Sequence, residues 1–142
     1  MTPGVDVMLD RPESVYSIVR LIDACTQCRQ TFHGASVTRS EPACTELTDK
    51  IRQRLDQFAV ELRNEVRQLH RKTLMSFIED FGSLRFEPIS GDSEVVALRQ
   101  MLDWYDQALN TPLRTEARAM IVRQHLELQQ CYEQLLALNH AA

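Results

Sequence analysis

Apolar residues between Leu47 and Leu69 recur at steps of four, four, three, four, four and three positions. The mean step of about 3.7 residues matches one face of an α-helix and exceeds the 3.5-residue period of a long coiled coil. We therefore predict a helix over residues 41–70, which at 1.5 Å per residue is roughly 45 Å long. A helix of that length with one apolar face needs long neighbours to cover it, so this segment predicts a helical bundle.

The same period occurs in three other stretches, at residues 12–37, 93–109 and 112–138. The four glycines and five prolines fall between the periodic segments or near their ends, as helix-breaking residues should. No stretch alternates apolar and polar residues in the manner of a strand. A chain of 142 residues suits one domain. We predict an all-α fold, an antiparallel up-down four-helix bundle that occupies residues 1–142 as a single domain.

Polar residues mark the expected helix ends. Ser40 and Asp92 are the expected N-caps of the second and third helices. The third helix is expected to end at Asn110, and the fourth is expected to start at Thr111-Pro112. So short a turn predicts that the last two helices are antiparallel neighbours.

Residues 71–92 form the longest connection, and they are too apolar for a solvated loop. We expect them either to contain a short helix over residues 73–81 or to continue the second helix. Two roles fit this stretch: a lid packed on the end of the bundle, or a partner-binding patch. The candidate partner-binding residues are Leu74, Phe77, Ile78, Phe81 and Phe86.

The charge of the chain argues against nucleic-acid binding. Its net charge is −4 and its only dense basic run is His70-Arg71-Lys72, whereas phosphate recognition needs a basic stripe. No apolar run approaches the ~20 residues of a membrane helix, and no basic segment of a secretory signal opens the chain. We expect a cytoplasmic protein that binds neither nucleic acid nor membrane.

A helical bundle raises the question of a two-metal carboxylate site. Such sites take a Glu from each of two helices and a Glu-x-x-His from each of the other two. No glutamate here has a histidine three positions later, so neither a metal nor a cofactor is expected. We interpret Glu61 and Glu65 as outward charges that pair with arginines one turn away.

No recognised catalytic motif is present: there is no Gly-rich phosphate loop, nucleophile elbow or His-Glu-x-x-His. The four histidines are scattered, and each is interpreted as a surface or cap residue. Trp104 and Tyr105 are adjacent, so one ring is expected to face the core and the other a helix seam. We predict no catalytic residue and a non-enzymatic protein.

The four cysteines offer the one weak chemical pattern, Cys25-Thr26-Gln27-Cys28. In thioredoxin-like enzymes such a pair follows a strand and opens a helix, where the dipole lowers the thiol pKa. Here it lies inside a predicted helix. We expect Cys25 and Cys131 to be buried and Cys28 to be less buried. The alternative is a zinc or redox site that joins Cys25 and Cys28 to Cys44 or Cys131.

Residues 21–25 read Leu-Ile-Asp-Ala-Cys, and Phe32 and Ala35 follow. This stretch resembles the opening helix of a bacterial family of ferritin-like bundles of unknown function, the domain-of-unknown-function 2383 family. The run at residues 105–109, with a proline soon after and Arg123-Gln124 beyond it, is similar to that family's third and fourth helices.

The resemblance implies a ferritin-like bundle with a longer crossover between the second and third helices. Many relatives carry a Glu where this chain has Leu98 and a His where it has Cys131. Both departures remove ligands that a metal would use, so the resemblance assigns no functional residue to this chain.

These observations favour a non-enzymatic bundle that serves as a protein-interaction or stress-related regulatory module of the bacterial cytoplasm. It would present the crossover or a helix face to a protein partner or to a second copy. The alternative is a metal-binding or thiol-redox protein built on Cys25 and Cys28. A small-ligand carrier with a pocket near Trp104 is a third hypothesis.

Overall fold

The computed structural model describes residues 12–38, 42–69, 71–81 and 93–141. These residues form helices α2 (Pro12–Thr38), α3 (Pro42–Arg67), α4 (Arg71–Phe81), α5 (Glu94–Leu109) and α6 (Thr115–Ala141). They contain no strand, which confirms the all-α prediction. No helix in this described part of the chain is long and apolar enough to cross a membrane.

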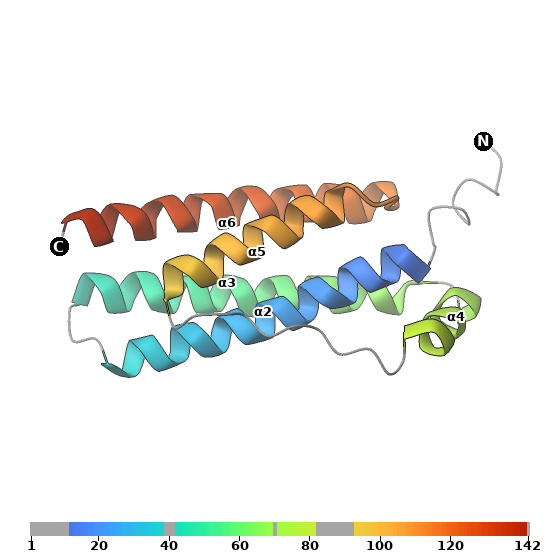
Figure 1. Ribbon diagram of the computed structural model, residues 1–142, viewed down its shortest axis with the longest axis horizontal. Coiled ribbons are helices and arrows are strands. Elements are labelled where there is room, and N and C mark those ends of the chain that lie inside the picture. The colour runs from blue at the N-terminus through green and yellow to red at the C-terminus, as the bar shows by residue number, and fades with distance from the viewer. Residues whose placement is uncertain (1–11, 39–41, 70, 82–92, 142) are drawn as a thin grey trace.

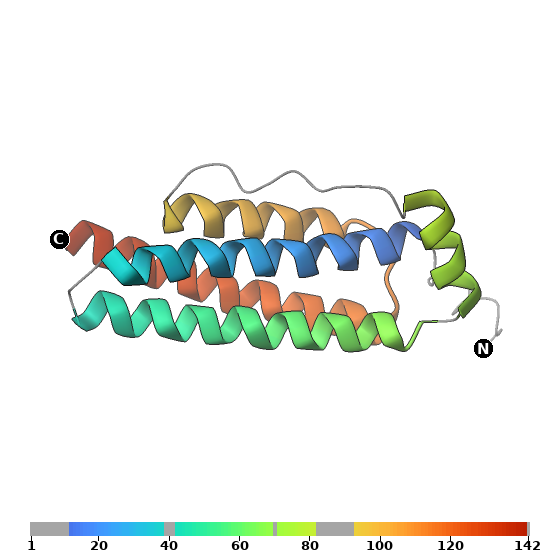
Figure 2. The same ribbon diagram turned by 90° about the horizontal axis from the view of Figure 1, so that it is seen from below.

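The four long helices lie side by side and α4 lies at one end of them (Figures 1 and 2). Each long helix packs against two others, in the order α2, α3, α6, α5 and back to α2, so α2 and α6 are diagonal to one another. The short helix α4 packs against α2. This ring encloses one core, which the inward faces of all four long helices supply.

The core is filled mainly by branched apolar and aromatic side chains, as the helical period predicts. Its largest fully buried side chains are Ile18, Leu21, Phe32, Ile51, Leu55, Phe58, Leu62, Leu98, Met101, Tyr105, Ile121 and Leu128. Each one contributes roughly 1.5–3 kcal/mol of transfer free energy when it leaves water. Two polar side chains, those of Tyr105 and Gln124, are as buried as these apolar neighbours.

The second helix does not run on into the crossover. It ends at Arg67, three residues before the predicted end at His70, and α4 begins at Arg71. The amides of Gln68 and Leu69 donate to the carbonyls of Glu65 and Val66 at 3.2 and 3.1 Å. These bonds span three residues and tighten the last turn, so the α-helical pattern stops there.

The link between α5 and α6 is longer than the predicted two-residue turn. Asn110 caps α5 as expected, but α6 begins at Thr115 rather than Pro112 and ends at Ala141 rather than Leu138. Leu113 is buried between the two helices. The guanidinium of Arg118 donates to the carbonyls of Leu109 and Thr111 at 2.8 and 2.9 Å, so side-chain bonds replace helical ones in this link.

The start of α5 also differs by one residue from the prediction. The N-cap is Ser93, which has extended backbone and accepts the first helical hydrogen bond from Ala97 at 3.0 Å. Helix α5 therefore begins at Glu94. The predicted caps Asp92 and Ser40 lie outside the described residues.

Candidate functional site

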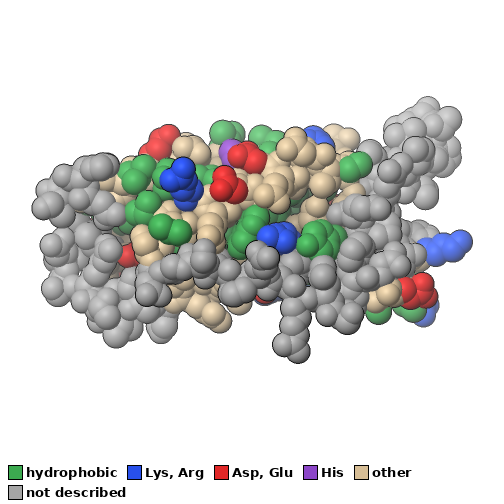
Figure 3. Space-filling view, in the orientation of Figure 1, with side chains coloured by type: hydrophobic (Ala, Val, Ile, Leu, Met, Phe, Trp, Pro, Cys, Tyr) green, Lys and Arg blue, Asp and Glu red, His purple; other side chains and the backbone are tan. Residues whose placement is uncertain are grey.

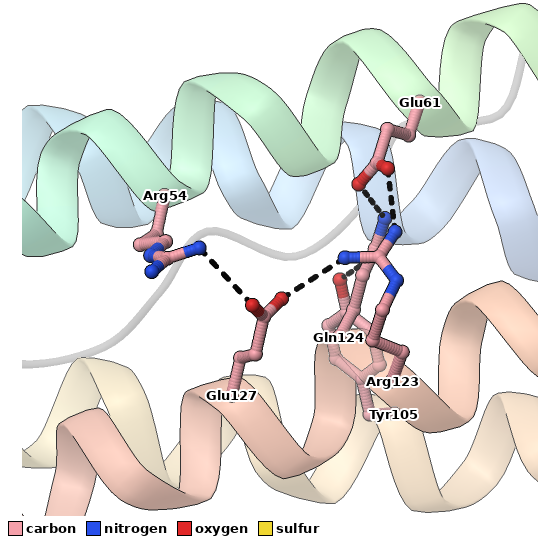
Figure 4. Close-up of polar contacts among 6 residues, drawn as sticks. All are labelled: Arg54, Glu61, Tyr105, Arg123, Gln124 and Glu127. Carbon is pink, nitrogen blue, oxygen red and sulfur yellow. Dashed lines mark hydrogen bonds and ion pairs between the residues drawn. The ribbon is translucent and has the colours of Figure 1, made fainter.

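One polar side chain from each long helix meets in the middle of the bundle. They are Cys25 of α2, Glu61 of α3, Tyr105 of α5 and Gln124 of α6, and we call this set the polar layer. The Tyr105 hydroxyl donates to Gln124 Oε1 at 2.6 Å, and Gln124 Nε2 donates to Glu61 Oε1 at 3.1 Å (Figure 4). The Cys25 thiol is hydrogen-bonded to the Tyr105 hydroxyl. The chain of bonds therefore links all four long helices.

The hydrogen bonds offset the free-energy cost of burying the polar groups of this layer. Tyr105 and Gln124 are both 0% exposed, and a buried amide or hydroxyl without a partner costs about 1–3 kcal/mol. Burial raises the pKa of Tyr105 well above its ordinary value, so its hydroxyl keeps the proton that the network needs. The contact with Cys25 also favours the protonated phenol, because it raises the pKa of Tyr105 and opposes the rise that burial causes in the pKa of the Cys25 thiol.

The polar layer continues into a chain of ion pairs between α3 and α6. Arg123 contacts Glu61 and also donates from Nη1 to Glu127 Oε2 at 3.1 Å, and Arg54 Nη1 donates to Glu127 Oε1 at 3.0 Å (Figure 4). We call Arg54, Glu61, Arg123 and Glu127 the α3–α6 seam. Two positive and two negative groups alternate along it, so the seam carries no net charge.

The seam corrects the prediction for Glu61 and Glu65. Both were expected to pair with arginines one turn away on their own helix, but both pair with α6 or its preceding link. Glu61 binds Arg123 and Gln124. Glu65 Oε1 lies 3.2 Å from Arg114 Nε, and the Glu65 side chain is only 8% exposed. Their position on the inner edge of α3 directs them across the bundle rather than along the helix surface.

The two cysteines of the Cys-x-x-Cys pattern are both fully buried. Cys25 is 1% exposed and Cys28 is 0% exposed, so the expectation of a less buried Cys28 is wrong. Residues three apart lie on the same helix face, and both thiols therefore face the core. Burial raises the pKa of Cys25 to about 12 and raises the pKa of Cys28 further, which removes the thiolate that nucleophilic and redox chemistry needs.

Cys131 is also buried, and burial raises the pKa of its thiol as well. The side chain of Cys44 lies outside the described residues. Among the residues that the structure describes, no three His, Cys, Asp or Glu side chains are close enough to hold a metal ion. The proposed grouping of Cys25, Cys28 and Cys131 is therefore not assembled by the described part of the fold.

The donor set of the polar layer also differs from that of a carboxylate metal site. Such sites have an inward-facing Glu on each of the four helices and a His on two of them, whereas this layer has one carboxylate, one amide, one phenol and one thiol. The single carboxylate already binds an arginine and an amide. These residues suit a closed hydrogen-bond network better than a hard cation, which prefers several oxygen ligands of negative charge.

A second buried polar contact lies between α3 and α5. Glu94 and Thr48 are 3% and 1% exposed, and the Thr48 hydroxyl donates to Glu94 Oε2 at 3.4 Å. Glu94 is the first residue of α5, and the positive end of the helix dipole stabilises a carboxylate there. Cys28 lies near enough for this carboxylate to raise the pKa of its thiol further, although burial raises it more.

Two surface depressions accompany these contacts. The larger one, with a cavity volume of about 570 Å³, opens between α3 and α6 beside the seam. One side of it is lined by Glu61, Asn64 and Glu65 of α3 and by Gln68 just beyond that helix. The other side is lined by Glu116, Ala119, Met120 and Arg123 of α6. The smaller one, of about 330 Å³, lies between α2 and α3 around the ion pair of Arg29 with Asp56.

Four of the five predicted partner-binding residues, Leu74, Phe77, Ile78 and Phe81, belong to α4. Leu74 is half-buried and Ile78 is 58% exposed, and Met75 beside them is 49% exposed. The side chains of Phe77 and Phe81 and all of Phe86 lie outside the described residues. Helix α4 spans Arg71–Phe81, two residues longer at its start than the predicted segment.

Trp104, the centre of the predicted ligand pocket, packs at a helix seam. Its ring lies 4.9 Å from the guanidinium carbon of Arg20, in a cation–π contact between α5 and α2. Tyr105 next to it faces the core, as expected for an adjacent pair on a helix. His125 is half-buried and its Nε2 lies 3.1 Å from Asp106, so this histidine bridges α6 to α5.

Comparisons with known proteins give this chain no relatives. No family model matches the sequence, and neither a curated protein nor a solved structure matches it. The functional argument therefore rests on the residues and contacts described above.

Proposed function

We propose that this chain is a non-enzymatic helical-bundle protein that serves as a protein-interaction or stress-related regulatory module of the bacterial cytoplasm. The observation that carries the proposal is the exposed apolar surface of α4. Met75 and Ile78 lie three residues apart on this helix, and about half of each side chain is in contact with water. Exposed apolar groups that recur on one helix face are typical of partner-binding sites.

The position of α4 supports this role. The helix packs against α2 at the end of the bundle, and Leu74 is half-buried. Helix α4 is thus anchored to the bundle, while the side chains of Met75 and Ile78 remain exposed. The proposed surface therefore consists of Met75 together with the residues predicted from the sequence, Leu74, Phe77, Ile78, Phe81 and Phe86.

The alternative, a metal-binding or thiol-redox protein that uses Cys25 and Cys28 with Cys44 or Cys131, has less support. Burial raises the pKa of the Cys25, Cys28 and Cys131 thiols, and reactive thiols need a lowered pKa and access to solvent. The polar layer is bonded internally instead of being open to a substrate.

We also propose a ferritin-like up-down topology with a long crossover. The course of the chain in Figure 1 supports it, since α2 and α3 run in opposite directions, α5 runs in the direction of α3, and α6 returns. A chain whose second and third long helices are parallel needs a connection as long as the bundle, and residues 68–93 are numerous enough to supply it. The resemblance to the bacterial family of unknown function fits this arrangement but remains a proposal.

The function can be tested by affinity capture with paired variants. Met75→Asp with Ile78→Asp places two charges on the exposed face of α4, and Val96→Asp places one on the exposed face of α5, where Val96 is 41% exposed. We expect the wild-type chain and the α5 variant to retain the same protein from a bacterial lysate, and the α4 variant to lose it. Equal capture by all three proteins would show that α4 is not the binding surface.

A further inference from the structure

The exposed face of α4 has a basic end, an apolar middle and an acidic end. Arg71 lies in the first turn, Met75 lies one turn further on, and Glu79 lies one turn beyond Met75; all three are exposed. Residues four apart lie above one another on a helix, so these three form a single stripe. Lys72 and Ile78 are also exposed, and their positions flank the stripe.

The order of these charges is the reverse of the order that stabilises an isolated helix. The positive end of the helix dipole lies at the N-terminus and favours acidic side chains, whereas the negative end favours basic ones. Helix α4 has no acidic residue in its first turn and no basic residue in its last turn. Departures from local preference are expected where side chains serve a function beyond their own helix. The charges of α4 therefore point to a partner.

The stripe is complementary to itself. Met75 lies four residues from Arg71 and four residues from Glu79. When two copies of α4 lie antiparallel about a two-fold axis at Met75, Arg71 of each copy lies opposite Glu79 of the other. The same register places Ile78 opposite Lys72, whose carbon chain can cover an apolar side chain. Such a pair has an apolar contact at its centre and an ion pair at each end.

The position of α4 leaves this face open to a second copy. The helix packs against α2 at one end of the four long helices (Figures 1 and 2). Charged and apolar side chains lie together on the surface at that end of the molecule, to the right in Figure 3. Met75 is 49% exposed and Ile78 is 58% exposed, so about half of each side chain can still be buried against another copy.

The size of the face sets the strength of the contact. Helix α4 has 11 residues, which corresponds to a length of roughly 16 Å. Two helices of this length bury much less than the roughly 800 Å² per partner that is typical of a stable complex. Contacts of smaller area belong to weak and transient complexes, and we expect a dissociation constant on the order of 100 μM.

We propose that α4 binds α4 of a second copy in a weak antiparallel dimer, with Met75 at the two-fold axis and Arg71 paired with Glu79 across it. The inference rests on the proposed function, because it names the partner of the surface proposed there. A contact of this strength responds to the concentration of the chain, and any other protein that binds α4 competes with the dimer.

The test is the average molar mass of the full chain, measured by sedimentation equilibrium between about 10 μM and about 1 mM, a range that brackets the expected dissociation constant. We expect the wild type to approach twice the 16.4 kDa of the single chain as its concentration rises. Arg71→Glu and, separately, Glu79→Arg replace both ion pairs by like charges. Each variant should therefore bind itself roughly tenfold more weakly than the wild type.

Mixing the two variants separates the proposed pairing from a general loss of structure. In an equimolar mixture of Arg71→Glu with Glu79→Arg, opposite charges face one another again at both ends of the pair, and the mass should return to that of the wild type. The matched controls are Arg99→Glu and Asp103→Arg, which make the same charge changes at exposed positions of α5. These controls should dimerise about as strongly as the wild type, both alone and mixed.

Two results would overturn the inference. One is a wild-type chain that stays monomeric at about 1 mM, ten times the expected dissociation constant. The other is a mixture of the α4 variants that associates no more strongly than either variant alone. If the chain stays monomeric while capture from a lysate still depends on Met75 and Ile78, the dimer is wrong but α4 remains the binding surface. If the chain stays monomeric and capture is also unchanged by those substitutions, the proposed function fails as well.

Discussion

The most informative single change is Tyr105→Phe, which removes one hydroxyl from the centre of the polar layer. The substitution keeps the volume of the ring and therefore the packing of α5. It removes the donor that now lies 2.6 Å from Gln124 Oε1. Gln124 is 0% exposed, so water cannot replace the lost donor unless the bundle opens.

The expected cost follows from this geometry. A buried acceptor left without a partner costs about 1–3 kcal/mol of unfolding free energy. For a chain of this size, that loss corresponds to a fall in Tm of roughly 3–9 °C. The assay is reversible denaturation by urea, followed by circular dichroism, with Tyr132→Phe on α6 as the control because Tyr132 is only partly buried.

A double-mutant cycle separates the hydrogen bond from the rest of the site. Gln124→Met removes the orphaned acceptor, while Glu61 keeps its contact with Arg123. We expect the double variant to be more stable than the sum of the two single losses by at least about 1 kcal/mol. A Tyr105→Phe protein as stable as the wild type, or additivity of the two changes within about 0.3 kcal/mol, would refute the account of the polar layer.

Two further predictions concern ionisable groups. Burial raises the pKa of Cys25 from its ordinary 9.0 to about 12, so this thiol stabilises the fold fully below pH 9 and loses that contribution as the pH rises toward 12. Between pH 9 and 10 such a thiol loses about 1 kcal/mol of its contribution to the free energy of unfolding. Cys25→Ala should therefore reduce the fall in unfolding free energy over this pH range by about that amount. An equal fall in the variant and the wild type would count against burial of the thiol. Arg114→Met leaves the Glu65 carboxylate, 8% exposed, without its 3.2 Å ion pair and should cost about 1–3 kcal/mol of unfolding free energy. Replacing Glu65 by Gln in the same protein should restore part of that loss, and a further loss there would mean that Glu65 is held by other groups.

The helices could be predicted from the sequence because their period is a local property. The steps from Leu47 to Leu69 place the apolar face of α3 correctly, and the same reasoning puts Tyr105 and Gln124 on inward faces. The inward positions of the polar residues Tyr105 and Gln124 in the sequence pattern were thus the signal from which a polar layer could have been predicted. Its partners could not be predicted, because they depend on how α5 and α6 are rotated against α3, and no local pattern encodes that rotation.

The errors have the same origin. Glu61 and Glu65 have arginines within reach on their own helix, so local reasoning pairs them there, but tertiary packing brings Arg123 and Arg114 closer. Cys28 was expected to be less buried because it lies away from the narrow stripe that Cys25 marks. In a bundle each long helix contacts two neighbours, so the buried face is wider than one stripe and includes Cys28.

The seam links the interior of this molecule to its surface. A hydrogen-bonded layer in the core gives little net stability, yet it penalises every helix rotation that breaks it, because each broken bond leaves a buried polar atom unpaired. Gln124 extends this constraint to Glu61, and Arg123 extends it to the solvent side of α3 and α6. The contacts that set the rotation of these two helices in the core therefore also set which side chains α3 and α6 present to solvent. A change at Tyr105 should loosen that arrangement as well as the fold, because the network reaches the surface through Arg123.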